Sequence, residues 1–228
     1  MPIKIRVFII ECPNPIDLLQ GRNEGKSLEQ ICKLIGHEAT SFHPRSKNDL
    51  ETVCKYISSI DREHDGTDNP DLPVCIHISS HGEEDGLVFG KDLLTWNELE
   101  AVLEPVCMKK TIYRGEKILI ISACEAKQQK LTKIIQKKLQ TNNGFQPIKH
   151  IFITAGKDVY WDDAVVAWAL FYNKIPKANL SKKKKILEVL SLIEKAELGH
   201  IHYYRWSAKK EQYQCFCANG KLKRFKLR

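Results

Sequence analysis

The chain has 228 residues, a formal net charge of +8 and 43% hydrophobic residues. This length and composition are sufficient for one buried core, and we expect a single domain that spans residues 1–228. No apolar run approaches the roughly 18 residues that cross a bilayer. The N-terminal apolar stretch is too short for a secretory signal, so we expect a cytoplasmic protein that does not bind membranes.

The positive charge is concentrated at the C-terminus. Residues 174–228 contain 15 basic and 4 acidic residues, a net charge of +11, whereas the first 173 residues contain 21 basic and 24 acidic residues, a net charge of −3. The tail also contains aromatic residues, and a basic face with exposed aromatic rings would suit nucleic acid or an acidic partner. The favoured alternative is a solvated helix start at 182–185 followed by ordinary strands. The aromatic residues are Tyr203, Tyr204, Trp206, Tyr213 and Phe216.

The first part of the chain alternates strand and helix patterns. Residues 3–10 form an apolar run that predicts a strand, and the proline-containing turn at 12–15 argues against a glycine-rich phosphate loop. Apolar residues then recur at helical spacing over 28–35 and 50–60, and a short strand is expected between them at 38–42. This alternation is typical of an α/β fold with a parallel sheet.

Two further apolar runs end at residues with catalytic chemistry. The run at 74–80 leads into His81-Gly82, and the run at 118–123 leads into Cys124, 43 positions after His81. Short runs rich in Ile and Val are typical of strands buried on both faces, and functional groups collect beyond the carboxyl ends of such strands. We therefore expect the imidazole and the thiol to share one edge of the sheet.

The rest of the chain continues the same alternation. Glycines at positions 86 and 90 flank a hydrophobic triplet, which predicts a small hairpin. Thr95 and Glu98 form a capping box that begins a helix. The remaining predictions are a helix over 131–139, a strand over 150–155, helices over 164–172 and 186–193, and a two-strand ribbon made of 201–206 and 212–216.

Cys124 and His81 have the chemistry of a nucleophile and its base. A thiol is only slightly ionised at neutral pH, so a nucleophilic cysteine needs a neighbouring imidazole to accept its proton. The backbone N–H groups of Gly82 and Cys124 could stabilise an oxyanion, each by about 3–4 kcal/mol. Because Gly82 has no Cβ, it would also let a substrate backbone approach closely. The alternative is that Cys124 is a small buried hydrophobic residue, as cysteines commonly are.

The residues around this pair resemble a known family. Ser80–Gly90 resembles the segment around the catalytic histidine of caspases, and Ile120–Cys124 resembles their cysteine strand. The segment Trp161–Ala164 and the following Phe171-Tyr172 resemble the C-terminal part of bacterial caspase-like proteins called CHAT domains, which are related to separase. The chain departs from the caspase signature Gln-Ala-Cys at Ser122 and, after the cysteine, at Glu125-Ala126.

The resemblance covers roughly residues 3–195 and implies a fold and an activity. The implied fold is an α/β caspase-like sandwich with a mostly parallel central sheet flanked by helices, comprising a core at 3–197 and a basic extension at 198–228 that contains the small β-ribbon. The implied activity is that of a prokaryotic cysteine endopeptidase, in which Cys124 attacks and His81 exchanges protons. The oxyanion would bind the N–H groups of Gly82 and Cys124.

The resemblance also implies partners and alternatives. We expect a protein substrate, a regulatory protein or upstream sensor in a defence or signalling pathway, and neither a cofactor nor a metal ion. The sequence does not identify a third group that orients His81. One alternative is a catalytically dormant interaction module with the same fold, and a second is a nucleic-acid-binding protein that uses the basic tail.

The residues that select the substrate are left open by the sequence. Arg22 lies where the resemblance places an arginine that holds an acidic substrate side chain, but Ser122 replaces the pocket glutamine of caspases. Asp162 or Asp163 would instead hold a basic side chain, as in metacaspase-like and separase-like proteins. Both arrangements cannot govern one pocket, and a surface charge for Arg22 or a helix N-cap for the aspartates is an equal alternative.

The other cysteines and histidines have structural explanations. Eight cysteines without a secretory signal are expected to be reduced, and most of them to be buried. Cys215 and Cys217 lack a second pair at zinc-site spacing. His77 and His81 would bind one metal ion only on a helix, because four residues of strand span about 13 Å. We therefore expect His77 to be a hydrogen-bonded strand residue.

Overall fold

The computed structural model describes residues 4–59, 70–108, 111, 113–124, 128–156 and 159–218. Its strands are β1 (Arg6–Cys12), β2 (Glu38–Phe42), β3 (Val74–Glu83), β4 (Gly86–Phe89), β5 (Asp92–Thr95), β6 (Lys117–Ser122), β7 (His150–Ala155), β8 (His200–Ser207) and β9 (Gln212–Phe216). One continuous path of strands runs in the order β2-β1-β3-β6-β7-β8-β9, and β4 and β5 form a hairpin on the end of β3.

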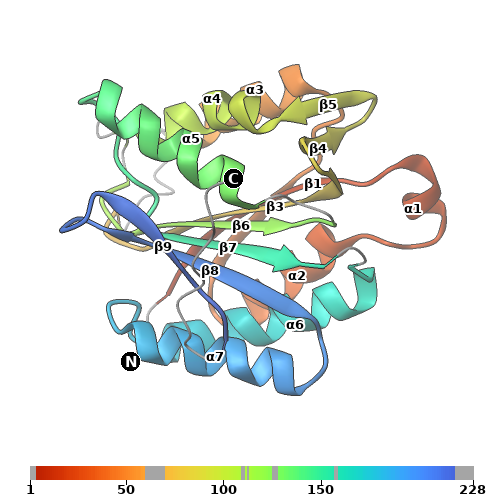
Figure 1. Ribbon diagram of the computed structural model, residues 1–228. Helices are drawn as coiled ribbons and strands as arrows, with labels where there is room; N and C mark the ends of the chain where they lie inside the picture. Colours follow the sequence, from red (N-terminus) through yellow and green to blue (C-terminus); the bar gives the residue numbers. More distant parts are fainter. Residues whose placement is uncertain are drawn as a thin grey trace.

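Helices cover both faces of this sheet. They are α1 (Pro15–Leu19), α2 (Glu24–Leu34), α3 (Lys47–Ser59), α4 (Trp96–Cys107), α5 (Gln128–Thr141), α6 (Trp161–Lys174) and α7 (Lys183–Lys195), with a short 3₁₀ helix at Ile175–Lys177. Helices α3, α4 and α5 lie on one face, α2, α6 and α7 lie on the other, and α1 projects from one end of the molecule (Figure 1). The expected α/β sandwich is confirmed. Within the described residues, no helix is long and apolar enough to span a bilayer.

The sheet is mostly parallel, as predicted. The strand pairs β2·β1, β1·β3, β3·β6 and β6·β7 are parallel, whereas β7·β8 and β8·β9 are antiparallel. The expected C-terminal ribbon is present, but it is not a separate unit. Its first strand pairs with β7 from His150↔Arg205 to Ala155↔His200, so residues 200–216 extend the central sheet.

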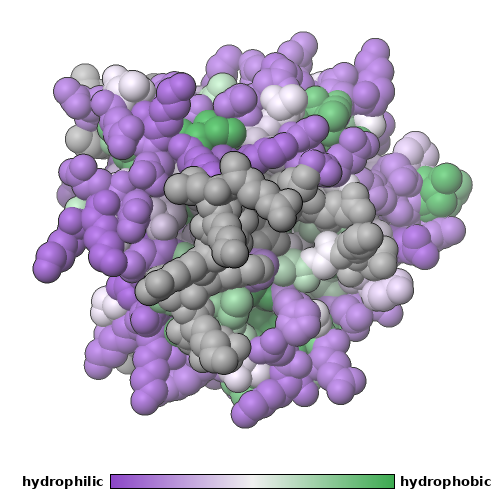
Figure 2. Space-filling view, in the orientation of Figure 1, coloured by the Kyte–Doolittle hydropathy of each residue, from purple (hydrophilic) through white to green (hydrophobic). Residues whose placement is uncertain are grey.

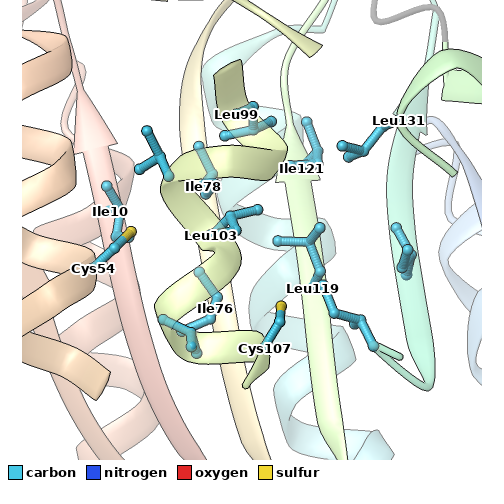
Figure 3. Packing of buried hydrophobic residues seen from close by; sticks show 14 of the residues in the cluster. Ile10, Cys54, Ile76, Ile78, Leu99, Leu103, Cys107, Leu119, Ile121 and Leu131 are labelled. Atoms are coloured by element: carbon cyan, nitrogen blue, oxygen red, sulfur yellow. The ribbon is translucent and has the colours of Figure 1, made fainter. Parts of the chain in front are cut away.

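The sheet separates two hydrophobic cores. On one face, Ile78 and Ile121 lie beneath Leu99 and Leu103 of α4 (Figure 3). The other face is more aromatic, because Phe171 of α6 packs against Phe152 of the sheet, Trp168 packs against Phe171, and Phe152 stacks on Tyr203. Burial of one aliphatic side chain, such as Ile78 or Leu99, contributes about 1.5–3 kcal/mol to the stability of the fold, so the two layers together hold the central strands in register.

The C-terminal aromatic residues belong largely to the core. Tyr203, Tyr204 and Phe216 are at most 5% exposed, so their rings are not available to stack on nucleic-acid bases. The lysine run gives α7 a solvent-exposed start, with Lys182 at its N-cap, as the structural alternative predicted. Among the described residues of the tail, these three rings therefore cannot contribute to a basic and aromatic binding face.

Local sequence signals agree closely with the observed elements. The strands at 38–42 and 150–155 have the predicted bounds, and the capping box of Thr95 and Glu98 begins α4. The first strand is shifted, because it begins at Arg6 and continues to Cys12, where it still pairs with β3. This shift places the acidic residue Glu11 inside the sheet.

Candidate active site

The two candidate catalytic side chains lie at the carboxyl edge of the parallel strands. His81 lies near the end of β3, and Cys124 lies two residues after β6. The structure brings them to one cavity of about 590 Å³, which is also lined by Arg22, Ser122 and Asp162. The partly exposed imidazole and thiol thus share one cavity.

Cys124 is held by backbone and side-chain contacts from neighbouring loops. The N–H of Ala123 donates to Oγ1 of Thr154 on β7 at 3.0 Å, which fixes the turn that carries the cysteine. The N–H of Val159 donates to Sγ of Cys124 at 3.3 Å. An N–H directed at sulfur is the kind of contact that stabilises a thiolate.

Most of the other thiols are unsuited to catalysis. Six of the eight cysteines are buried, as expected, and only Cys124 and Cys217 are partly exposed. Burial raises the pKa of four of these thiols to about 12, so they stay protonated. These four are Cys32, Cys54, Cys75 and Cys107. Cys124 therefore differs from them in having both access to the cavity and a nearby imidazole.

His81 has an acidic neighbour that sequence reasoning did not find. Its Nε2 lies 2.7 Å from Oδ2 of Asp17, a residue of α1 that is 3% exposed. The edge of the Trp161 ring also faces the imidazole, with the ring centroids 5.9 Å apart. The only sequence signal for Asp17 is local, because Asn14 and Asp17 form a capping box. Nothing in that box indicates a contact 64 residues away.

Gly82 is required by the close approach of strand β3 and the loop that follows β6. A Cβ at this position would lie 2.0 Å from the carbonyl oxygen of Cys124 and 3.0 Å from Cβ of Ala123. The sequence had suggested that the missing Cβ makes room for a substrate. In the structure, the group that occupies this space is the backbone of Cys124 itself, so the glycine brings the histidine strand and the cysteine loop together.

A buried polar network supports the floor of the cavity. Oε2 of Glu24 accepts hydrogen bonds from the hydroxyls of Ser79 at 2.7 Å and Ser122 at 3.2 Å. The indole N–H of Trp168 donates to the Ser122 hydroxyl at 3.0 Å. Ser122, which the resemblance placed in the substrate pocket, lines the cavity but has its hydroxyl engaged by these two partners.

His77 belongs to the same network. It is fully buried, its Nε2 lies 3.0 Å from Oε1 of Glu24, and its Nδ1 lies 2.9 Å from the Tyr172 hydroxyl. The prediction that His77 is a hydrogen-bonded strand residue is confirmed. Within the described parts of the chain, no group of three or more His, Cys, Asp or Glu side chains is arranged to hold a metal ion.

Another carboxyl group lies behind this network. Glu11 is fully buried, and its Oε1 accepts a hydrogen bond from the backbone N–H of Glu24 at 2.6 Å. Burial raises the pKa of Glu11 to about 7, and the negative charges of Glu24 and Asp17 act in the same direction. The acidic side of the site therefore contains a carboxyl group that changes its charge near neutral pH.

The candidate specificity residues lie around two adjoining cavities. Arg22 and Asp162 line the main cavity, and the Arg22 guanidinium lies 3.9 Å from Oδ1 of Asp17. Asp163 lines a smaller cavity of about 230 Å³ together with Glu197. Both aspartates lie in the first turn of α6, where Tyr160 is the N-cap residue, so the alternative N-cap role for the aspartates is wrong. Glu125 and Ala126, which depart from the caspase pattern, lie outside the described residues.

Comparisons with known proteins show a similarity to solved structures but none to a family model or a curated protein. No protein-family model matches the sequence, and no curated protein matches it. Among solved structures, the chain is similar to the crystal structure of caspase-1 from Spodoptera frugiperda. The two share 12% sequence identity, the match covers 78% of each chain, and the TM-score is 0.46.

Proposed function

We propose that this protein is a cysteine endopeptidase with Cys124 as nucleophile and His81 as general base and acid. The observation that carries the proposal is the shared cavity, in which a partly exposed thiol and an imidazole lie just past the last parallel pair of β3 and β6, Ser79↔Ser122. The buried thiols elsewhere in the chain have no such access. This combination supports acyl transfer through a covalent intermediate.

The proposed reaction proceeds in two stages. His81 removes the proton from the Cys124 thiol, and the sulfur attacks the carbonyl carbon of the scissile peptide bond. The N–H groups of Gly82 and Cys124 stabilise the oxyanion, and protonated His81 gives its proton to the leaving amine. Water, deprotonated by His81, then hydrolyses the thioester and regenerates the thiol.

We further propose that the activity is controlled by another protein. A peptidase with an open cavity in a prokaryotic cytoplasm would damage other proteins unless it were restrained. A regulatory partner or an upstream sensor in a defence or signalling pathway would supply that restraint. Purification of the protein from its own cells, before and after the defence or signalling pathway is stimulated, would show whether such a partner binds to it.

Covalent labelling tests the catalytic proposal directly. The purified protein is incubated with a panel of peptide acyloxymethyl ketones, and the adducts are located by mass spectrometry. We expect an adduct on Cys124 that disappears in Cys124→Ala and falls strongly in His81→Ala. Cys217→Ala is the matched control, because Cys217 is the other partly exposed cysteine. Its labelling at Cys124 should equal that of the wild type.

The opposite results would favour other functions. Absence of any Cys124 adduct in folded protein would contradict the peptidase proposal and favour a dormant interaction module. The nucleic-acid alternative predicts binding that weakens steeply with salt and is lost when exposed lysines of α7, such as Lys184 and Lys185, are changed to glutamate. These substitutions are preferable to truncation, because residues 200–216 belong to the sheet.

A further inference from the structure

We infer that Asp17 is a positioning residue for His81, so the site operates as a Cys-His-Asp arrangement whose acid comes from the projecting helix α1. This inference rests on the proposed function, because it assigns a role within the same site. If Asp17 had only a structural role, its substitution would affect only the stability of the fold. The positioning role predicts in addition that its substitution changes the tautomer of His81 and the reactivity of the Cys124 thiol.

The contact between Asp17 and His81 sets which ring nitrogen carries the proton. Oδ2 of Asp17 lies 2.7 Å from Nε2 of His81, and the Asp17 side chain is only 4% exposed. An ionised carboxylate can only accept hydrogen bonds, so Nε2 must be the donor. In neutral His81 the lone pair is then on Nδ1, which leaves Nδ1 as the nitrogen that accepts the thiol proton.

The carboxylate is fixed by the capping box of α1. The backbone N–H of Asn14 donates to Oδ2 of Asp17 at 3.0 Å, and the N–H of Asp17 donates to Oδ1 of Asn14 at 2.8 Å. The side-chain amide nitrogen of Asn14 lies 3.1 Å from Nε2 of His81, but it is itself a donor and makes no hydrogen bond to Nε2 while Nε2–H donates to Asp17. These reciprocal bonds restrict rotation of the carboxylate, and both residues of the box face the imidazole.

The buried charge of Asp17 has a cationic partner. The guanidinium of Arg22 lies 3.9 Å from Oδ1 of Asp17, and the backbone N–H of Arg22 donates to the carbonyl oxygen of Asp17 at 2.8 Å. Burial penalises an uncompensated carboxylate, and the Arg22 guanidinium supplies a compensating positive charge. A carboxylate in this position stabilises the imidazolium that forms when Cys124 loses its proton.

The arrangement of α1 argues against a purely structural role. A five-residue helix is too short to be stable by itself, and such a segment is normally held by apolar side chains that face the core. In α1 the apolar residues Ile16, Leu18 and Leu19 are 62%, 46% and 88% exposed, and Figure 2 shows hydrophobic surface at this projecting end. The one buried residue of the helix is Asp17. The helix therefore directs its carboxylate inward and its apolar side chains to solvent.

Two readouts that need no substrate test this inference. Asp17→Asn keeps the shape and the capping geometry but removes the charge, and Leu19→Ala is the matched control on the same helix. We expect Asp17→Asn to slow alkylation of Cys124 by iodoacetamide by about 10- to 100-fold, the effect of one lost charge-assisted hydrogen bond. In nitrogen NMR spectra of labelled histidine, His81 should be the Nε2–H tautomer in the wild type and lose that preference in the variant. Leu19→Ala should match the wild type in both measurements.

Kinetics with a cleavable peptide separates positioning from binding. Asp17→Asn should lower kcat by about 10- to 100-fold and leave KM nearly unchanged, because Asp17 acts through His81. Equal alkylation rates and equal His81 spectra in Asp17→Asn and wild type would overturn the inference. If Asp17→Asn does not fold, a wild-type spectrum with His81 protonated on Nδ1 alone would also overturn it.

Failure of the inference and failure of the proposed function give different results. If Cys124 cleaves peptides and Asp17→Asn is as active as the wild type, the peptidase proposal stands and the role of Asp17 is wrong. If Cys124 alkylation depends on Asp17 but no peptide is cleaved or captured, the positioning role stands and the peptidase proposal is wrong.

Discussion

The hydroxyl of Tyr172 on α6 lies 2.9 Å from Nδ1 of His77 on β3, beneath the floor of the cavity. The same hydroxyl lies 3.5 Å from Sγ of Cys75, and both Tyr172 and His77 are fully buried. Helix α6 is therefore attached to the central strand by a polar contact inside an otherwise aromatic core. This contact connects the packing of the sheet to the network that ends at Glu24.

Removal of that hydroxyl should destabilise the fold. Tyr172→Phe leaves Nδ1 of His77 without this partner in a dry environment, and we expect the free energy of unfolding to fall by about 1–3 kcal/mol. Urea denaturation followed by circular dichroism measures the change. Tyr56→Phe, at a tyrosine that is 52% exposed, is the control and should change stability by less than about 0.5 kcal/mol. Equal values for the two variants would contradict the role of the network.

Substitution of Gly82 should move β3 away from the loop that carries Cys124. In Gly82→Ala the new Cβ would lie 2.0 Å from the Cys124 carbonyl oxygen, so one backbone must move. Because a misplacement of about 1 Å can cost about 100-fold in rate, we expect peptide capture by Cys124 to fall by at least that factor. Glu83→Ala, an exposed neighbour on β3, should capture peptide at the wild-type rate. Normal capture by Gly82→Ala would show that the close approach is not needed for catalysis.

The titration of Glu11 should make stability depend on pH. Its folded pKa of about 7 lies above the ordinary value of 4.5, so the folded chain holds the proton more tightly than the unfolded chain. The stabilising contribution is therefore complete below about pH 4.5 and is lost as the pH rises to about 7, with a total change of about 3 kcal/mol. Glu11→Gln should lose this part of the pH dependence.

Denaturation at pH 5 and pH 8 measures the Glu11 effect. The unfolding free energy of Glu11→Gln minus that of the wild type should be larger at pH 8 than at pH 5. Glu188→Gln changes an exposed carboxylate and is the control, which should follow the wild type at both values. A constant offset between Glu11→Gln and the wild type would show that Glu11 does not titrate in this range.

The charges of the cavity predict a preference for basic substrate side chains. Glu24 at the floor and Asp162 in the wall are acidic. The positive charge of the nearby Arg22 is offset by Asp17, whose Oδ1 lies 3.9 Å from the guanidinium. We expect Asp162→Asn to lower kcat/KM for peptides with lysine or arginine before the scissile bond by about fivefold, as for an exposed ion pair. Asp163→Asn is the matched control, because its side chain lines the neighbouring cavity. A preference for acidic peptides that depends on Arg22 would contradict this prediction.

Activity should not require cleavage of the chain between Cys124 and His150. Helix α5 occupies Gln128–Thr141, within this stretch. Leu131 and Ile135 of this helix are buried in the core, so cutting there would disturb folded structure. Intact-mass measurement of the active, peptide-labelled protein should give a single uncut chain. Labelling found only on cut protein would disprove this prediction.

Local sequence patterns were sufficient for most elements of the fold. Strands 38–42 and 150–155 and the capping box at Thr95 depend on residues close together in the chain, and the structure has them where they were predicted. The placement of residues 201–206 was harder to predict. The hairpin itself has a local pattern, but its antiparallel pairing with β7 joins segments about 50 residues apart.

The sequence by itself determined the chemistry that the site can use. The apolar runs that lead to His81 and Cys124 predict that both groups follow buried parallel strands, because the apolar pattern that identifies such a strand lies in the residues of the strand itself. Only the tertiary structure decided which carboxylate faces His81, since α1 reaches the imidazole through folding and not through sequence spacing. It likewise decided that Gly82 makes room for the Cys124 backbone and that Ser122 is bonded to Glu24. Such contacts depend on the relative positions of distant elements, which are fixed by the packing of the two cores on the sheet.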